Sequence, residues 1–156
     1  MDWHGKQVLI VDDEAPTRWL LAILFRERGA EVHLAADAES GLRMVGEHHP
    51  HLVLLDILMP GMNGWEVLQI LRQTSDVPVV VLTSTSNGDS EARCLDAGAD
   101  DHVAKPFDRD VLLARCWAPV RRYLNLGVEQ PAPAVAKPQP PSRNGVSHFA
   151  AWRTTG

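Results

Sequence analysis

The chain has 156 residues, of which 45% are hydrophobic and 22% charged, so it is long enough for one globular domain and too short for two ordinary ones. Its net charge of −5 argues against a general nucleic-acid or membrane-surface binder, because both need a basic face. No apolar stretch approaches the length of a membrane span and the start lacks the apolar core of a signal peptide. Only Cys94 and Cys116 are cysteines, far apart in the sequence, so we expect a cytoplasmic protein with reduced thiols.

Short apolar runs alternate with helical patterns from residue 6 to about residue 124. The runs are predicted to be strands, and they cover residues 8–11, 32–35, 52–55, 79–82 and 102–104. Three of them are continuously apolar, as is typical of strands buried on both faces. Five successive strand-then-helix units predict a doubly wound α/β domain, with a five-stranded parallel sheet and helices on both faces.

The predicted helices carry start and stop signals. Pro16 lies near the start of the first helix, and the apolar positions that we expect to face the core there are Trp19, Leu20, Ile23 and Leu24. Asn63, with Glu66 three residues later, predicts a capping box at the start of the third helix. Pro119 should kink or end the last helix, because its ring clashes with the carbonyl four residues back.

The composition changes beyond Leu126. Five of the eleven prolines fall in the last thirty residues, at positions 131, 133, 138, 140 and 141. This pattern is typical of an extended or flexible segment. We therefore predict a folded domain over residues 1–126 and a Pro/Ala-rich tail over residues 127–156.

Chemically active side chains follow four of the predicted strands. Asp12 and Asp13 end the first strand, Asp56 ends the third, Thr83 ends the fourth and Lys105 ends the fifth. The carboxyl ends of parallel strands share one edge, and in a flavodoxin-like sheet of order 2-1-3-4-5 the ligand site lies between strands 1 and 3. Three carboxylates there need protons or a hard cation such as Mg²⁺. A capping role explains single aspartates, but it does not explain the lysine or the shared edge.

The loop after the first strand also excludes common ligands of this fold. A flavin or nucleotide site needs a loop rich in Gly, Ser or Thr whose N–H groups bind phosphate. Residues 12–16 instead read Asp-Asp-Glu-Ala-Pro, which would repel a phosphate that lacks a metal. We therefore do not expect FMN binding.

Four segments together resemble the receiver domain of response regulators in two-component systems, over roughly residues 5–124. They are Val-Leu-Ile-Val-Asp-Asp-Glu (8–14), Leu-Val-Leu-Leu-Asp-Ile-Leu-Met-Pro-Gly-Met-Asn-Gly (52–64), Val-Val-Val-Leu-Thr-Ser (79–84) and Gly-Ala-Asp-Asp-His-Val-Ala-Lys-Pro-Phe (98–107). The resemblance implies that Asp56 accepts a phosphoryl group from a sensor histidine kinase or phosphotransfer protein.

The resemblance also implies the roles of the neighbouring residues. Asp13, Asp56 and the backbone carbonyl of Leu58 would bind Mg²⁺, for which Mn²⁺ could substitute, and Asp12 would hold it through water. Lys105 would pair with the phosphoryl oxygens, and Thr83 would hydrogen-bond one of them. The Lys105–Pro106 bond is a candidate cis peptide, as in the family.

The implied output is a switch of the helix 4, strand 5 and helix 5 face that controls a protein partner. The activity would be phosphotransfer to the protein itself with slow dephosphorylation, so the chain would not be an enzyme acting on external metabolites. We expect no direct nucleic-acid or membrane binding, and a homodimer through the same face is an option that Val111 and Pro119 make doubtful. An alternative is the amino-terminal part of a DNA-binding transcription regulator. A phosphatase would need a second acid where Leu58 stands.

Several residues depart from the family pattern or carry two interpretations. His102 stands where the family has its switch Tyr or Phe; it fills the same half-buried place or biases the switch by titrating near neutral pH. His48, His49 and His51 are solvated turn residues or, less expectedly, ligands of a soft metal. Three tryptophans at helical positions are expected to be core or half-buried, namely Trp19, Trp65 and Trp117.

Overall fold

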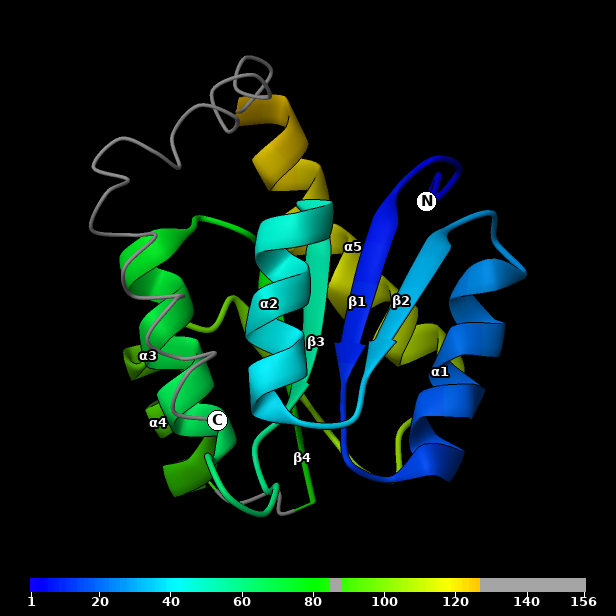
Figure 1. Cartoon of the computed structure of the whole chain (residues 1–156). Coiled ribbons are helices and arrows are strands. Elements are labelled where there is room, and N and C mark those ends of the chain that lie inside the picture. Colours follow the sequence, from blue (N-terminus) through cyan, green and yellow to red (C-terminus); the bar gives the residue numbers. More distant parts are fainter. Residues whose placement is uncertain (85–87, 127–156) are drawn as a thin grey trace.

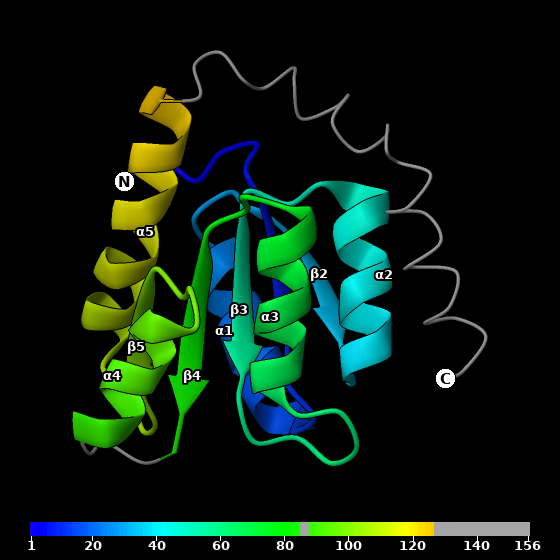
Figure 2. The ribbon, with the colours of Figure 1, turned by 90° about the vertical axis from the view of Figure 1, so that its left-hand side faces the viewer.

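The fold is the predicted doubly wound α/β domain, described by a computed structural model over residues 1–84 and 88–126. Five parallel strands form one sheet in the order β2-β1-β3-β4-β5, in which β1 to β4 are labelled in Figure 1 and β5 in Figure 2. The strands are β1 (Gln7–Val11), β2 (Glu31–Ala35), β3 (Leu52–Asp56), β4 (Val79–Thr83) and β5 (Asp101–Ala104). The helices are α1 (Ala15–Arg26), α2 (Ala38–His48), α3 (Gly64–Thr74), α4 (Gly88–Asp96) and α5 (Arg109–Leu126).

The helices cover both faces of the sheet, and each face has its own apolar core. Helices α1 and α5 pack on one face, while α2, α3 and α4 pack on the other (Figures 1 and 2). Neighbouring residues of β1 face opposite cores, with Val8 and Ile10 on the α1 side and Leu9 and Val11 on the α2 side. This double burial explains why the strands are continuously apolar rather than alternating.

The start of α3 shows the predicted capping box. The side chain of Asn63 accepts the N–H of Glu66 at 3.1 Å, and the Glu66 carboxylate accepts the N–H of Asn63 at 3.1 Å. The next residue, Gly64, lies so close to the end of β3 that an added Cβ would be 2.5 Å from Ile57 Cα and 2.6 Å from the carbonyl oxygen of Asp56. The loop after Asp56 therefore returns tightly to the strand end, which needs glycine at this position.

The predicted core face of α1 is wrong at three of its four positions. The side chains of Trp19, Leu20 and Ile23 are 65%, 46% and 51% exposed, and only Leu24 is buried as expected. The buried positions of the helix are Leu21, Ala22, Leu24 and Phe25. Residues 19–25 are all apolar, so the helix has two overlapping apolar faces. The spacing of apolar residues therefore does not indicate which of the two faces packs against the sheet. Trp19 is thus a surface residue, not a core or half-buried one.

A tryptophan near the N-terminus, which the sequence patterns did not indicate as a core residue, belongs to the apolar core between the sheet and helices α1 and α5. Trp3 is fully buried and makes edge-on contacts with Phe25 at 4.9 Å and with Trp117 at 5.1 Å between ring centroids. Trp117 and Trp65 are partly buried, as predicted.

The last helix does not end at Pro119. Helix α5 continues through this buried proline to Leu126, so of the two predicted effects, a kink or an end, the end does not occur. Both cysteines are buried and unpaired, as expected. No helix within residues 1–84 and 88–126 combines the length and apolarity needed to cross a membrane. The predicted tail over residues 127–156 lies outside the described part of the chain.

Candidate functional site

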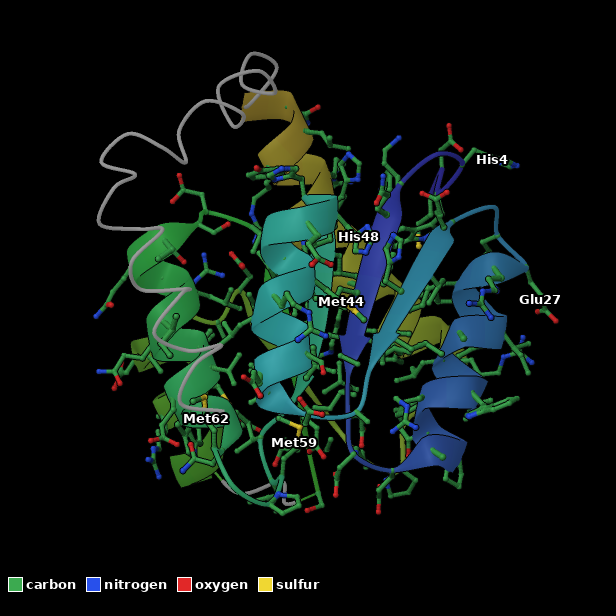
Figure 3. The ribbon with its side chains drawn as sticks, viewed as in Figure 1. His4, Glu27, Met44, His48, Met59 and Met62 are labelled. Atoms are coloured by element: carbon green, nitrogen blue, oxygen red, sulfur yellow. The ribbon has the colours of Figure 1, made fainter. Side chains whose placement is uncertain are left out.

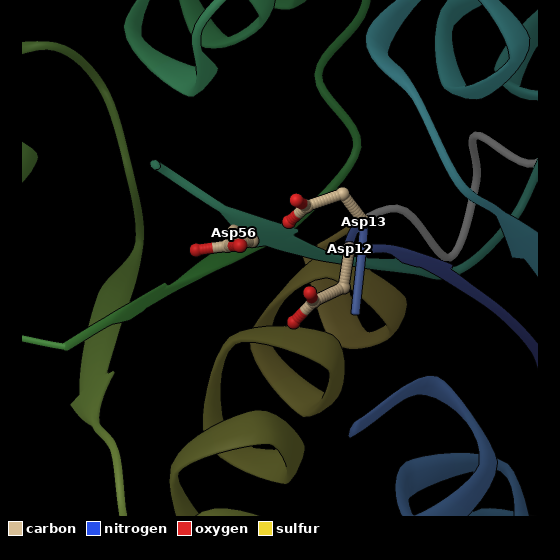
Figure 4. Close-up of side chains that lie close together, drawn as sticks. All are labelled: Asp12, Asp13 and Asp56. Atoms are coloured by element: carbon tan, nitrogen blue, oxygen red, sulfur yellow. The ribbon is translucent and has the colours of Figure 1, made fainter. Parts of the chain in front are cut away.

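Three carboxylates meet at the carboxyl edge of the sheet. Asp12 and Asp13 follow β1, Asp56 ends the neighbouring β3, and one oxygen from each lies within 4.8 Å of the others (Figure 4). The two strands are hydrogen-bonded in register, with Val11 opposite Leu55, so their ends are necessarily adjacent. Asp12 is fully buried and Asp56 is 4% exposed, whereas Asp13 is exposed. The cluster is therefore a buried pair with one carboxylate at the solvent boundary.

The environment of Asp56 strongly disfavours its charge. Burial and the neighbouring Asp12 carboxylate raise the pKa of Asp56 to about 7, against the opposing effects of Lys105 and of the Leu58 N–H. That N–H donates to Asp56 Oδ1 at 3.2 Å. Crowded carboxylate oxygens of this kind are the donor set of a hard divalent cation, which would relieve their mutual repulsion. The residues present therefore fit a metal site.

The lysine that ends β5 enters the same cluster. Lys105 Nζ donates to Asp12 Oδ2 at 3.0 Å, and it lies 3.4 Å from Glu14 Oε1 and 3.7 Å from Asp56 Oδ2. Burial would lower the pKa of Lys105, but the hydrogen bond with Asp12 and the nearby carboxylates outweigh burial and raise it. The Lys105–Pro106 peptide bond is cis, as predicted. One protonated amine thus balances part of the negative charge.

The hydroxyl residue and the loop after β3 occupy the predicted edge as well. Thr83 ends β4 and is 5% exposed, and its carbonyl accepts the backbone N–H of Lys105 at 2.7 Å. Leu58 is the second residue after β3; it is 60% exposed, and its backbone N–H donates to Asp56. The structure therefore brings together all the site residues that the sequence placed at this edge.

Two contacts of the site were not predicted. Glu14 shares Lys105 with the buried carboxylates, and Arg18 Nη1 donates to the carbonyl of Asp12 at 2.7 Å. Glu14 directly follows Asp13, and Arg18 lies one helical turn after Glu14. This spacing in the sequence could have indicated that both side chains reach the end of β1. Arg18 therefore fixes the backbone at the end of β1.

His102 and the histidines near β3 lie in different environments. His102 on β5 has a side chain that is 16% exposed, and its Nε2 lies 3.2 Å from Glu91 Oε2 on α4. His48, labelled near the end of α2 in Figure 3, stacks on His33 of β2, and the two ring centroids are 3.9 Å apart. His51 Nδ1 instead accepts the N–H of Gln7 at 2.9 Å.

These contacts bear on the metal hypothesis for the histidines before β3. His49, the third member of that group, is exposed and ends α2 in the left-handed conformation with φ 49°. Within residues 1–84 and 88–126, only the three aspartates form a convergent group of three or more candidate metal ligands. The described structure therefore does not support the histidine metal site.

Comparison with known proteins decides the family. Residues 8–116 match the model of the response regulator receiver domain. The chain belongs to this family. The receiver domain is 40% identical over 122 residues to the DNA-binding response regulator MtrA of Mycobacterium tuberculosis, covering 78% of this chain and 54% of MtrA. It is 36% identical over 147 residues to the phosphate regulon transcriptional regulatory protein PhoB of Shigella flexneri, covering 92% of this chain and 62% of PhoB.

A solved structure shows the same fold. The Francisella response regulator 1452 receiver domain superimposes with a TM-score of 0.72 at 28% identity, and the match covers 76% of this chain and 98% of that one. The chain spans about half the length of the MtrA relative. The two-component receiver assignment accordingly applies to the folded domain.

Two acids at or next to β5, Asp100 and Asp101, form ion pairs within the receiver domain. Arg115 Nη1 lies 3.2 Å from Asp101 Oδ1, and Arg72 Nη2 lies 3.7 Å from Asp100 Oδ2. Val111 is 47% exposed on α5. Dimerisation through α4, β5 and α5 stays a prediction.

Proposed function

We propose that this receiver domain accepts a phosphoryl group on Asp56 from a phosphohistidine of a sensor kinase or phosphotransfer protein. The observation that supports this most strongly is the position of Asp56: it is buried between two other aspartates and Lys105 at the carboxyl end of β3. An oxygen of Asp56 forms the bond to phosphorus while the phosphorus–nitrogen bond of the donor breaks, and the electron pair stays on the donor imidazole. A carboxylate is a competent nucleophile for such an acyl phosphate.

Mg²⁺ is the proposed cofactor, and Mn²⁺ is its expected substitute. Asp13, Asp56 and the backbone carbonyl of Leu58 would hold it directly, and Asp12 would hold it through water. A divalent ion neutralises the charge of phosphoryl oxygens during transfer. The support for this assignment is the convergence of the three carboxylates within 4.8 Å.

The other site residues receive roles that follow from their positions. Lys105 is shared by three carboxylates at 3.0 to 3.7 Å, so it is close enough to pair with phosphoryl oxygens on Asp56. Thr83, at the end of the adjacent β4, is proposed to donate a hydrogen bond to one of those oxygens. The added charge would then change the face formed by α4, β5 and α5 and with it the affinity for a protein partner.

The chemistry proposed is transfer to the protein itself followed by slow hydrolysis. It does not include turnover of an external metabolite, so we propose a switch rather than an enzyme. Leu58 supports this, because an apolar residue stands where a phosphatase would need a second acid.

A small phosphodonor with Mg²⁺ tests this proposal. Intact-mass analysis should show one added phosphoryl group on the wild-type protein and none on Asp56→Asn. Asp96→Asn, which removes an exposed acid of α4, serves as the matched control and should be modified normally. Equal modification of Asp56→Asn and the wild type would overturn the assignment, as would transfer that is unaffected by chelating the divalent ion.

A DNA-binding output is the second candidate for what the switch controls. It is favoured by the names of the relatives MtrA and PhoB, of which the chain covers 54% and 62%. Reading the gene beyond the codon for Gly156 separates this candidate from a receiver that acts by protein contact alone. A following DNA-binding domain would support the former.

A further inference from the structure

Few of the described side chains of helix α4, those of residues 91–96, attach the helix to the domain. Among its described side chains, residues 91–96, only Cys94 is buried in the core, at 1% exposure. Arg93 lies over the ring of Trp65 on α3 at 4.1 Å, and Glu91 reaches His102 on β5. An element with so little buried apolar surface depends on such polar contacts for its position.

The ring of His102 lies between two carboxylates. Its Nε2 is 3.2 Å from Glu91 Oε2 on α4, and its Nδ1 is 3.9 Å from Asp101 Oδ1 on β5. The Nδ1 atom is buried and has no hydrogen-bond partner. On α5, Arg115 contacts the same Asp101 oxygen at 3.2 Å, and on β4 the neighbour in register is the apolar Val81. Nε2 therefore has its carboxylate partner on α4, whereas Asp101 Oδ1 lies beyond hydrogen-bond distance of Nδ1 and also accepts the backbone N–H of His102 at 2.8 Å.

We propose that His102 is a proton-controlled latch between β5 and α4, which holds α4 in place when the ring is protonated and loosens it when the proton leaves. A protonated imidazole always has an N–H at Nε2 for the Glu91 carboxylate, and it places a positive charge between the two acids. The neutral ring has one N–H, so one of the two nitrogens must turn a lone pair toward a carboxylate. The Glu91 contact also loses its charge assistance.

The direction of the pH effect follows from these states. The latch needs an ionised Glu91 and a protonated His102, so it weakens as the pH rises and the ring gives up its proton. If the domain switches as proposed above, partner affinity at the α4–β5 face will also vary with pH. That consequence rests on the proposed function, whereas the latch itself does not.

Amide hydrogen exchange of the unphosphorylated, full-length chain tests the latch directly. Peptides covering α4 are followed between pH 5.5 and 8, with rates corrected for the intrinsic pH dependence of exchange. We expect the protection of α4 to fall by about two- to fivefold across this range in the wild type, the effect of one partly exposed ion pair. In His102→Phe, which keeps an aromatic ring without a titrating proton, the protection should not depend on pH.

Two further variants keep the test independent of any damage to β5. Glu91→Gln leaves His102 in place but removes the anion, so it should also flatten the pH profile of α4. His4→Gln removes an exposed histidine of the N-terminal segment and should keep the wild-type profile. A flat wild-type profile, or an unchanged profile in both His102→Phe and Glu91→Gln, would overturn the latch. No phosphodonor is present, so failure of phosphorylation at Asp56 would not affect the result.

Discussion

Replacing Asp56 by Asn should stabilise the metal-free domain and remove part of the dependence of its stability on pH. The carboxyl group is 4% exposed, and burial together with Asp12 raises its pKa from the ordinary 3.8 to about 7. Asn keeps nearly the same shape and cannot ionise. The substitution therefore removes a negative charge that lowers the stability of the folded domain when Asp56 is ionised.

The sign and the size of the effect follow from linkage. Between pH 3.8 and about 7 the unfolded chain loses the Asp56 proton while the folded domain keeps it, so the free energy of unfolding falls as the pH rises through this interval. A full rise of the pKa from 3.8 to about 7 corresponds to about 4 kcal/mol above pH 7. Because Asp56 titrates together with Asp12 beside Lys105, we expect about half of this, ~2 kcal/mol, to be measured.

Urea unfolding in the presence of a chelator measures this difference. The free energies of unfolding of wild type and Asp56→Asn are compared at pH 5, 6.5 and 8, with Asp96→Asn as an exposed-acid control. The advantage of Asp56→Asn should grow with pH, and the control should follow the wild type. The reasoning is refuted if Asp56→Asn is the less stable protein at pH 8, or if its difference from wild type is the same at all three values.

The remaining predictions concern packing and backbone, and each is read from the same unfolding measurement. Gly64→Ala should lower the free energy of unfolding by about 2 kcal/mol or more, because its Cβ would lie 2.5 Å from the Ile57 backbone. Gly46→Ala in α2 should leave the free energy of unfolding unchanged or raise it by up to about 1 kcal/mol, because a Cβ there meets no atom of another part of the chain within 4 Å. Equal effects of the two substitutions would contradict this. Trp3→Ala should cost about 3–5 kcal/mol and Trp19→Ala, at a side chain 65% exposed, less than about 1 kcal/mol; the reverse order would show that the two environments are misassigned. Asn63→Ala should cost about 1 kcal/mol through loss of the capping box, and no loss would argue that the cap is unimportant.

The sheet and the candidate site could be predicted because their signals are local and their assembly follows a general rule. Each strand is a short apolar run, and Asp12, Asp56, Thr83 and Lys105 each stand at the end of one. Once the strands are parallel, these ends must share an edge. The capping box of α3 was predictable for the same reason, since it depends only on Asn63 and the residues that follow it.

The features that could not be predicted depend on which surfaces meet in space. Residues 19–25 offer two apolar faces to the sheet, and contacts with the rest of the core decide that Leu21 and Phe25 are buried while Trp19 is not. The Glu91–His102 contact joins α4 to β5 and has no spacing rule behind it. Pro119 is tolerated inside α5, although its ring disfavours a helix interior, which local preference alone did not indicate.

Locating the modified residue is the most direct test of whether Asp56 is the phosphoacceptor. The domain is treated with a small phosphodonor and Mg²⁺, the acyl phosphate is reduced with borohydride, and the peptides are sequenced by mass spectrometry. Reduction converts a phosphorylated aspartate into homoserine, which marks its position. We expect homoserine at Asp56 alone; homoserine at Asp12 or Asp13 with Asp56 unchanged would show that Asp56 is not the phosphoacceptor.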